Sequence, residues 1–346
     1  MEPSGGDQRS RRVGIRDVAE RAGVGISTVS RVLAGRTNVR PELRERVIAA
    51  AGELGYQPDV LAQSLRRGKT RSVGFIADDL SNHLIADIAT GAESILRAHG
   101  YSLLVMNSEL DPELDAENIA VLRSRRVDAL MMCPVEEAHA ATVEALTSLE
   151  IPLCIVEGDQ PATVPASYVL SDHRDGIRRA VRHLVSLGHR RIVLLTGPDR
   201  YRSARERAAG LADVAAADPS LALERVAIEL STEDGERTAS ALLARPAPPT
   251  AFVVGGARLL VGVLRALETA GREPGKDVAI VTADAHPIAS VFRPPLATVM
   301  RDPAAVGRAA AEILLRHIAD PAAPPETIVL GTSYVPRASA SPAPGR

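Results

Sequence analysis

The 346-residue sequence is poor in several features that usually reveal the class of a protein. It has no tryptophan, and aromatic residues make up only 2% of the chain. Its two cysteines, Cys133 and Cys154, lack the spacing of a metal or redox motif, so we expect reduced thiols in buried strands. No run of 18 apolar residues is present, and residues 1–12 are polar and basic without a signal-peptide pattern. We therefore expect a cytoplasmic protein that does not bind a membrane.

Motifs of the common enzyme classes are absent as well. The chain has no Gly-x-Ser-x-Gly, phosphate-binding loop, His-Glu-x-x-His or Gly-x-Gly-x-x-Gly sequence. Its eight histidines are scattered, and His183 and His189 fall on or just after an expected helix, where solvated side chains are the ordinary outcome. These observations indicate no enzyme, no cofactor and no metal site. A free solute-binding protein is a third class, but it would need a signal peptide.

Charge is distributed unevenly along the chain. The net charge is −2, but residues 1–71 contain 14 basic and 8 acidic residues, whereas the remainder contains 27 basic and 35 acidic ones. The 45% hydrophobic and 24% charged content is that of a globular protein long enough for two or three domains. A basic head on an acidic body is typical of a polyanion-binding module joined to a sensor. A merely solvated basic tail is the alternative that charge alone leaves open.

Three short helices are predicted in the basic head. Apolar residues recur at helical spacing from Ile15 to Ala22, a second helix is expected over 26–34, and a third begins at Pro41 and ends at Gly55. Gly23 and Gly25 separate the first two helices, which is the arrangement of a helix-turn-helix unit.

The second helix has the properties of a DNA-reading helix. On a helical wheel Val29 and Val32 face the first helix, whereas small residues and Arg31 face outward. Small side chains permit close approach to a groove, and arginine can donate two hydrogen bonds to guanine. An ordinary solvated helix with one exposed arginine is the alternative.

A very short helix is expected at 60–67, between Pro58 and Gly68. It is too short to be stable alone, and Leu61 and Leu65 stand beside basic residues, which suits a leucine wedge in the minor groove. A linker helix that docks on the body remains possible. We therefore expect a hinge at 59–70.

From Ser72 onward, short apolar strands alternate with helices. This pattern predicts buried parallel sheets in βαβ units, and about ten strands suit two doubly wound α/β lobes facing a cleft, after an all-α head. The expected strands are 73–77, 103–106, 129–133, 153–156, 192–195, 251–254 and 278–281. The expected domains are a disordered arm (1–12), the helix-turn-helix domain (13–58), the hinge (59–70), the body (71–338) and a disordered low-complexity tail (339–346). The lobes are expected to combine 72–168 with 297–327, and 169–296 with 328–338.

Several of these segments together resemble the LacI/GalR family of bacterial transcription regulators. The resemblance is most specific in the head and continues more loosely through the body. It is carried by residues 15–33, 39–47, 53–58, 61–70, 75–82, 187–192, 203–205, 294–299 and 307–310. It implies a homodimeric repressor that binds a palindromic operator in double-stranded DNA, with a body like that of periplasmic sugar-binding proteins and a small-molecule effector in its cleft.

The resemblance also implies which residues meet DNA. The matching positions read bases, contact the backbone or, in the hinge, intercalate; they are Ile26, Ser27, Thr28, Ser30, Arg31, Asn38 and Leu65. Two residues depart from the family pattern, because Gly25 and Arg40 stand where serine usually caps the second and third helices.

The implied effector site departs further from the family. Arg205 and Asp284 match effector-contacting positions of the family, Asp172 is a candidate from its place at a strand end facing the cleft, and Leu84 is a candidate at a position where the family has an aromatic residue. Gly256-Ala257 stands in place of the usual Asn-Asp pair, and Leu84 and Ile85 replace paired aromatic residues, so a sugar-stacking platform is not expected. We therefore predict a small or anionic effector gripped by Arg205. A structural ion pair between the lobes, and a cleft that has lost its ligand, remain the alternatives.

Overall fold

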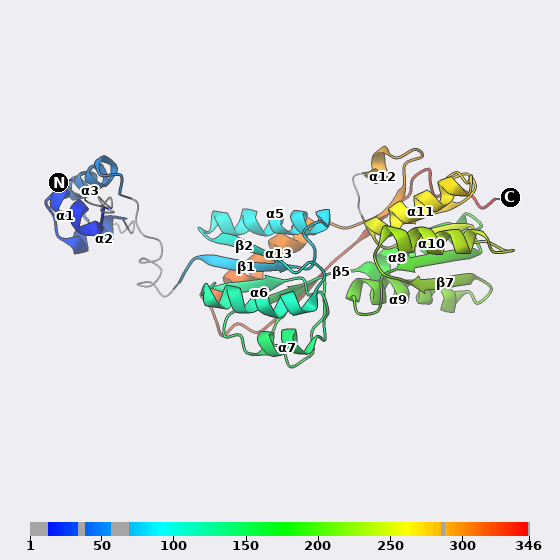
Figure 1. Ribbon diagram of the computed structural model, residues 1–346, viewed down its shortest axis with the longest axis horizontal. Helices are drawn as coiled ribbons and strands as arrows, with labels where there is room; N and C mark the ends of the chain where they lie inside the picture. Colours follow the sequence, from blue (N-terminus) through cyan, green and yellow to red (C-terminus); the bar gives the residue numbers. More distant parts are fainter. Residues whose placement is uncertain (1–12, 34–38, 57–68, 285–287, 345–346) are drawn as a thin grey trace, which may run out of the picture. The chain divides into compact units, whose positions relative to one another are not determined.

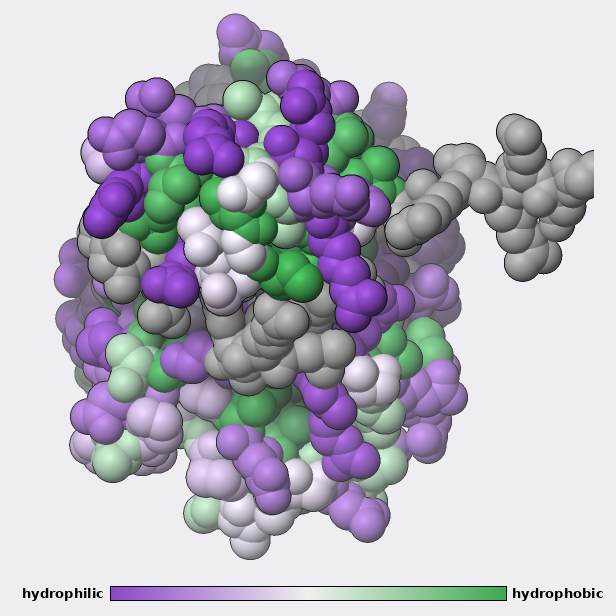
Figure 2. Space-filling view, turned by 90° about the vertical axis from the view of Figure 1, so that its left-hand side faces the viewer, coloured by the Kyte–Doolittle hydropathy of each residue, from purple (hydrophilic) through white to green (hydrophobic). Residues whose placement is uncertain are grey.

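A computed structural model describes residues 13–33, 39–56, 69–284 and 288–344 (Figure 1). The chain divides into two compact units, residues 1–70 and 71–346. Within the described ranges, no helix is both long and apolar enough to cross a membrane. The face in Figure 2 is largely covered by hydrophilic side chains, with smaller apolar areas between them, as a chain with 24% charged residues allows.

The first unit contains the three predicted helices α1 (Ile15–Ala22), α2 (Ile26–Leu33) and α3 (Pro41–Glu53). Their apolar faces meet in a small core around Val29 and Val47, both fully buried. Between α1 and α2 the chain turns sharply, because Gly23 adopts the left-handed conformation (φ 61°) that favours glycine.

The second unit is built on two six-stranded sheets. The first sheet is entirely parallel, and the second is parallel except for its β12 edge, which pairs antiparallel to β10. In spatial order the first sheet contains β11 (Thr327–Leu330), β5 (Ser167–Ser171), β4 (Leu153–Val156), β3 (Ala129–Met132), β1 (Ser72–Ala77) and β2 (Ser102–Asn107). The second contains β12 (Ser333–Val335), β10 (Ala297–Met300), β9 (Ala279–Thr282), β8 (Ala251–Val254), β6 (Arg191–Thr196) and β7 (Ala222–Ala227).

Helices cover both faces of each sheet, so each lobe has two cores, as the buried apolar strands predicted (Figure 1). In lobe 1 they are α5 (His83–Ala98) with α13 (Pro303–Ala319), and α6 (Pro112–Ser124) with α7 (Ala140–Thr147) on the other face. In lobe 2 they are α8 (His173–Ser186) with α9 (Arg202–Ala217), and α10 (Thr232–Leu243), α11 (Ala257–Thr269) and α12 (Ile288–Val291) on the other face.

The chain passes between the lobes three times, after β5, after β10 and after β11. As predicted, each lobe is built from segments that are not contiguous in the sequence. Two of the predicted boundaries between these segments are wrong. Strand β10 pairs with β9 in lobe 2, although residues 297–327 were assigned as a whole to lobe 1. Strand β11 pairs with β5 in lobe 1, although residues from 328 onward were assigned to lobe 2. Strand β11 is an edge strand and β10 is the next strand to the edge strand β12, and an apolar run of four residues does not reveal which strand it will pair with.

The end of the chain differs from the expectation of disorder after residue 338. Ser339 is fully buried: its Oγ donates to the Ile280 carbonyl (2.6 Å) and accepts from the Ala297 N–H (2.8 Å). Ala340 joins the core of lobe 2, and the Ala343 N–H donates to the Leu187 carbonyl (3.0 Å). The small residues of this tail gave it the composition of a low-complexity segment. Because it is small, Ser339 fits between strands β9 and β10.

Candidate functional site

Helix α2 exposes the side chains that the sequence analysis predicts to read DNA. Ile26 is 41% exposed, Ser27 and Arg31 are also exposed, and Thr28 and Ser30 are half-buried. The Arg31 Nε donates to the carbonyl of Ser27 on the same helix (3.2 Å), so its guanidinium lies along the outward face. The buried Val29 and Val32 on the opposite side fix the direction in which this face points.

The turn before α2 is stabilised by a side chain of α3, and not by a side chain that caps α2. Arg46 on α3 donates to the carbonyl groups of Ala22 and Gly23 at the end of α1. The carbonyl of Gly25 accepts the first hydrogen bonds of α2, and Arg40 before α3 makes no side-chain cap. The other two predicted DNA-contacting residues, Asn38 and Leu65, lie outside the described residues, as does most of the predicted hinge.

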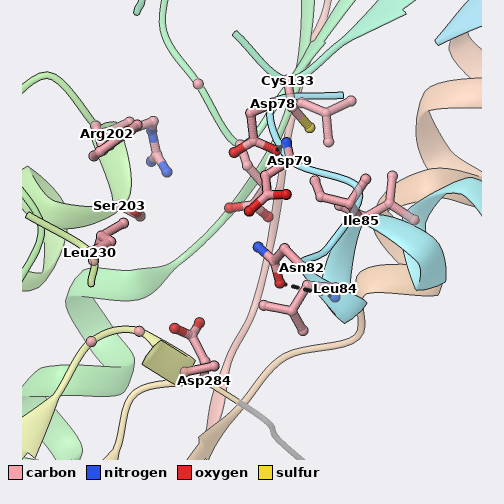
Figure 3. A pocket seen from close by; sticks show the side chains of 18 of the residues that line it. Asp78, Asp79, Asn82, Leu84, Ile85, Cys133, Arg202, Ser203, Leu230 and Asp284 are labelled. Carbon is pink, nitrogen blue, oxygen red and sulfur yellow. Dashed lines mark hydrogen bonds between the residues drawn. The ribbon is translucent and has the colours of Figure 1, made fainter. Parts of the chain in front are cut away.

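In the second unit, a cavity of about 250 Å³ lies between the two lobes. It opens at the carboxyl ends of the parallel strands, the usual place for a ligand in α/β folds. Figure 3 shows Asp78 and Asp79 of lobe 1 facing Arg202 and Ser203 of lobe 2, with Asp284 of lobe 2 below them.

Charged side chains at the back of this cavity form one connected network. Asp284 Oδ1 accepts from Arg207 (2.8 Å) and from Arg301 (3.2 Å), and all three side chains are largely buried. Arg301 also pairs with Glu157 (3.4 Å), which accepts from Ser171 (2.5 Å) and contacts His173 (3.0 Å). Since Glu157 belongs to lobe 1 and Asp284 to lobe 2, Arg301 joins the lobes electrostatically.

The network changes the ionisation of its members. Burial alone would raise the pKa values of Glu157 and Asp284, but the neighbouring guanidinium groups outweigh it and lower both. No guanidinium group in the described part of the chain pairs with Asp78, and burial raises its pKa to about 7. The cavity therefore combines carboxylates that stay ionised with one that titrates near neutrality.

Two of the four predicted effector-contacting residues line the cavity. Asp284 does so from lobe 2, and Leu84 does so with Ile85 from the start of α5. Asp172 does not: it caps α8, with its Oδ1 accepting from the Asp175 N–H (2.9 Å). Within the described residues no group of three or more His, Cys, Asp or Glu side chains could hold a metal.

Arg205 is also absent from the cavity lining. Its guanidinium donates to Glu137 (2.5 Å) and Asp159 (2.8 Å) at the rim, where the two lobes meet. Arg205 thus takes part in an ion pair between the lobes, as in the alternative interpretation, but its partners are Glu137 and Asp159, whereas Asp284 pairs with Arg207 and Arg301. The predicted anionic effector loses its anchor, because two carboxylates already neutralise this arginine.

Arg207, two positions further on, is one of the arginines that do line the cavity. Its burial could have been read from the sequence, because it shares a helical stripe with the other inward-facing residues of α9. Those buried residues are Ala204, Arg207, Leu211 and Val214. Arg301, Glu157 and His173 were missed because each follows or precedes a strand without a recognisable motif.

Comparisons with known proteins support both units. A family model described as "Bacterial regulatory proteins, lacI family" matches residues 14–59, and one described as "Periplasmic binding protein-like domain" matches residues 181–340. The chain is 33% identical over 341 residues to the transcriptional regulator MalR of Streptomyces coelicolor, covering 95% of this chain and 97% of that protein. It is 32% identical over 303 residues to the lactose operon repressor of Escherichia coli, covering 87% and 83%.

Solved structures give the same result for the whole chain. A crystal structure of the lac repressor dimer, bound to operator and the anti-inducer ONPF, superposes with a TM-score of 0.85 at 28% identity, covering 96% of this chain and all of that one. The complex of the transcriptional regulator CelR with cellobiose superposes with a TM-score of 0.68 at 27% identity, covering 95% and 100%. Both the head and the two-lobed body are thus shared with these proteins.

Proposed function

Because this chain belongs to the lacI family of bacterial regulatory proteins, we propose that it is a cytoplasmic repressor that binds an inverted-repeat operator as a homodimer. We further propose that a small molecule in the cavity between the lobes modulates this binding. The observation that carries the proposal is the outward face of α2 on a head that matches the family model.

The base-reading surface consists of Ile26, Ser27 and Arg31 on α2, with Thr28 and Ser30 beside them for backbone contacts. Two apolar anchors hold the helix against α1, so the exposed side chains can enter the major groove while the head stays folded. By the family resemblance, Asn38 extends this surface, and Leu65 inserts into the minor groove from the hinge.

A second copy of the chain is the partner that the apolar surface of lobe 2 would fit. Val261 on α11 and Ile288 and Val291 on α12 are exposed, and a groove lined by Leu264 and Phe292 lies beside them. Pairing this surface around a two-fold axis would bury it and bring together two heads for the two halves of a palindrome.

In the cavity, we assign ligand contacts to Asp284 and Arg207, with Leu84 and Ile85 as the apolar wall. Among the described residues, the lining contains a single tyrosine, Tyr201, and no phenylalanine. A ligand held by hydrogen bonds to the charged groups therefore suits the cavity better than one held by stacking between aromatic rings.

The DNA part is tested by selecting bound sequences from random duplexes with the purified full-length chain. We expect an enriched inverted repeat whose half-sites are related by two-fold symmetry. Enrichment of direct repeats or of no sequence would contradict the proposal. A genome-wide binding map then identifies the regulated genes.

The ligand part is tested by a thermal-shift screen of metabolites, repeated on the Asp284→Asn variant. A ligand present at about 100 times its dissociation constant stabilises the fold by about 2.7 kcal/mol. We expect a stabilising compound whose effect is lost in the variant. A library without any stabilising compound would favour the alternative that the cavity has lost its ligand.

A further inference from the structure

The rim of the cavity carries a contact that the proposed function does not require. Glu137 follows β3 in lobe 1, and its carboxylate reaches across to α9 of lobe 2. Oε1 accepts from the backbone N–H of Arg202 (3.0 Å), the first residue of α9, and Oε2 accepts from the Arg205 guanidinium (2.5 Å). One carboxylate of lobe 1 thus binds both a helix start and an arginine of lobe 2.

Helix α9 lacks a capping side chain of its own. Tyr201 precedes the helix and makes no side-chain cap, whereas α5 and α6 are capped by the residues directly before them, Asn82 and Asp111. The start of a helix carries unpaired N–H groups and a partial positive charge, both of which favour an anion. Glu137 therefore supplies from the other lobe the cap that α9 does not have.

Glu137 is held in position for this role. The Asp159 N–H donates to its Oε1 (3.0 Å), and Asp159 also pairs with Arg205 (2.8 Å) and Arg202 (3.4 Å). Gly158 permits this loop to approach closely, because a Cβ there would lie 2.7 Å from Pro134 Cγ. The Arg205 guanidinium is fixed in turn by the carbonyl of Asp199 (2.7 Å).

A second contact joins the lobes at another part of the cavity lining. Arg258 at the start of α11 in lobe 2 donates to Asp79 (2.8 Å) and Ser81 (2.8 Å) of lobe 1. Asp79 and Arg258 both line the cavity, as does Glu137. The lobes are thus joined at separate points around the cavity by side chains of the protein itself.

We propose that the Glu137 carboxylate is an internal ligand of lobe 2, which binds the start of α9 and Arg205 and holds the lobes closed without any small molecule. The contact between Asp79 and Arg258 supports the same closure. The link from closure to operator binding rests on the proposed function, but the closure itself does not. An effector must then enter a cavity that is already closed, in competition with contacts made by the chain.

The two cysteines of the chain provide a direct test of closure. Cys133 lines the cavity and is 5% exposed, whereas Cys154 on β4 is fully buried in the core of lobe 1. Opening of the lobes would admit a maleimide to Cys133 but not to Cys154. The labelling rate of each thiol in the full-length protein can be followed separately by peptide mass spectrometry.

We expect Glu137→Ala to raise the labelling rate of Cys133 about tenfold without changing that of Cys154. Arg205→Ala should have a similar effect, and the double variant should add little, because both residues act through one contact. Higher salt should also accelerate Cys133 labelling in the unmodified protein, since it screens ion pairs at the partly exposed rim. The milder Glu137→Gln variant removes the charge while preserving the shape of the side chain.

Matched controls separate opening from a general loss of charge. Glu136→Ala removes the neighbouring carboxylate, and Arg200→Ala removes an arginine that pairs with Glu229 within lobe 2. Neither should change the labelling of Cys133. The proposal is overturned if Cys133 remains as slow in Glu137→Ala and Glu137→Gln as in the unmodified protein. It is also overturned if both thiols accelerate by the same factor, because that result indicates unfolding. Neither outcome depends on DNA binding.

Discussion

Arg207 and Asp284 form an ion pair that is almost completely removed from water, with side chains 5% and 8% exposed. Two charges in such a place are stable only together, since each neutralises the other and fills its hydrogen-bonding capacity. Arg301 contributes a second cation to Asp284, but no other carboxylate hydrogen bond to Arg207 is present among the described residues. Neutralisation of the Arg207 charge therefore depends on its partner more than neutralisation of the Asp284 charge does.

Replacing Arg207 by methionine should lower the free energy of unfolding by about 3–5 kcal/mol, because it removes a cation from a buried carboxylate. Adding Asp284→Asn should recover part of this loss, since the uncompensated charge disappears. Urea denaturation of the three variants measures both effects. Arg200→Met is the control: its exposed pair with Glu229 should contribute no more than about 1 kcal/mol. Equal losses for the two arginines would contradict this description of the network.

Arg31 is the residue of α2 best suited to discriminate between bases. Arg31→Ala should cost about 1–3 kcal/mol of binding to the selected operator and relax the preference at one base pair in each half-site. The measurement is a binding titration against every single-base variant of the operator. Arg16→Ala, which removes an exposed arginine from α1, should weaken all sequences alike. A uniform loss for Arg31→Ala would assign it to phosphate contact instead.

At this scale the sequence predicts the outward face of α2 well but the cavity only in part. Helical periodicity places Val29 and Val32 inward, and the structure agrees. The same periodicity applied to α9 would have selected Arg207, whereas the family resemblance led to Arg205. Which carboxylate pairs with which arginine depends on contacts between lobes, and no local pattern contains that information.

Among the elements, α5 and α13 are joined most closely. Gly307 on α13 faces the backbone of α5, where an added Cβ would lie 1.9 Å from the carbonyl oxygen of Ile88. Gly91 on α5 likewise faces Ala304, at 2.1 Å from its carbonyl oxygen. Because backbone atoms cannot turn aside, the two helices would have to separate to admit a side chain at either position.

Gly307→Ala should therefore destabilise the body by about 1–3 kcal/mol through overpacking. Its effect should exceed the gain that alanine normally brings to a helix interior. Thermal and urea unfolding provide the measurement. Gly331→Ala is a suitable control, since a Cβ there meets nothing within 4 Å and should leave stability unchanged. A Gly307→Ala variant with a higher free energy of unfolding would show that α5 and α13 can move apart without loss of stability.

Element boundaries were predicted to within a residue or two for the central strands, because their apolar runs are continuous. Strands β4 and β8 have the predicted bounds, and β1 and β6 differ by one residue at either or both ends. The tail was not predicted, since Ser339 is buried only by its fit between β9 and β10. The composition of a segment does not reveal whether the folded protein has a space in which that segment can pack.

For the whole molecule, the exposed apolar side chains of α11 and α12 lead to a prediction about assembly. Val291 is 66% exposed, and Val291→Glu would place a charge in the centre of the proposed contact between copies. We expect the variant to sediment as a monomer and to bind the operator far more weakly, because two linked heads bind with a higher effective concentration than one.

Val329→Glu is the matched control for assembly. Val329 is 54% exposed on the edge strand β11 of lobe 1, so the substitution adds the same charge to another apolar surface position. It should leave the sedimentation of the protein unchanged. A monomeric Val329→Glu variant together with a dimeric Val291→Glu variant would move the interface to lobe 1.

The three passages between the lobes have a consequence for synthesis on the ribosome. Helix α13 and strand β11 complete lobe 1, yet they are translated only after nearly all of lobe 2. Until residue 319 has been made, α5 alone covers its face of the first sheet and lacks its neighbour α13. Until residue 330 has been made, β5 lacks its neighbour β11. The nascent chain must therefore carry an incomplete first lobe while the second is made, a period in which chaperones would protect it from aggregation.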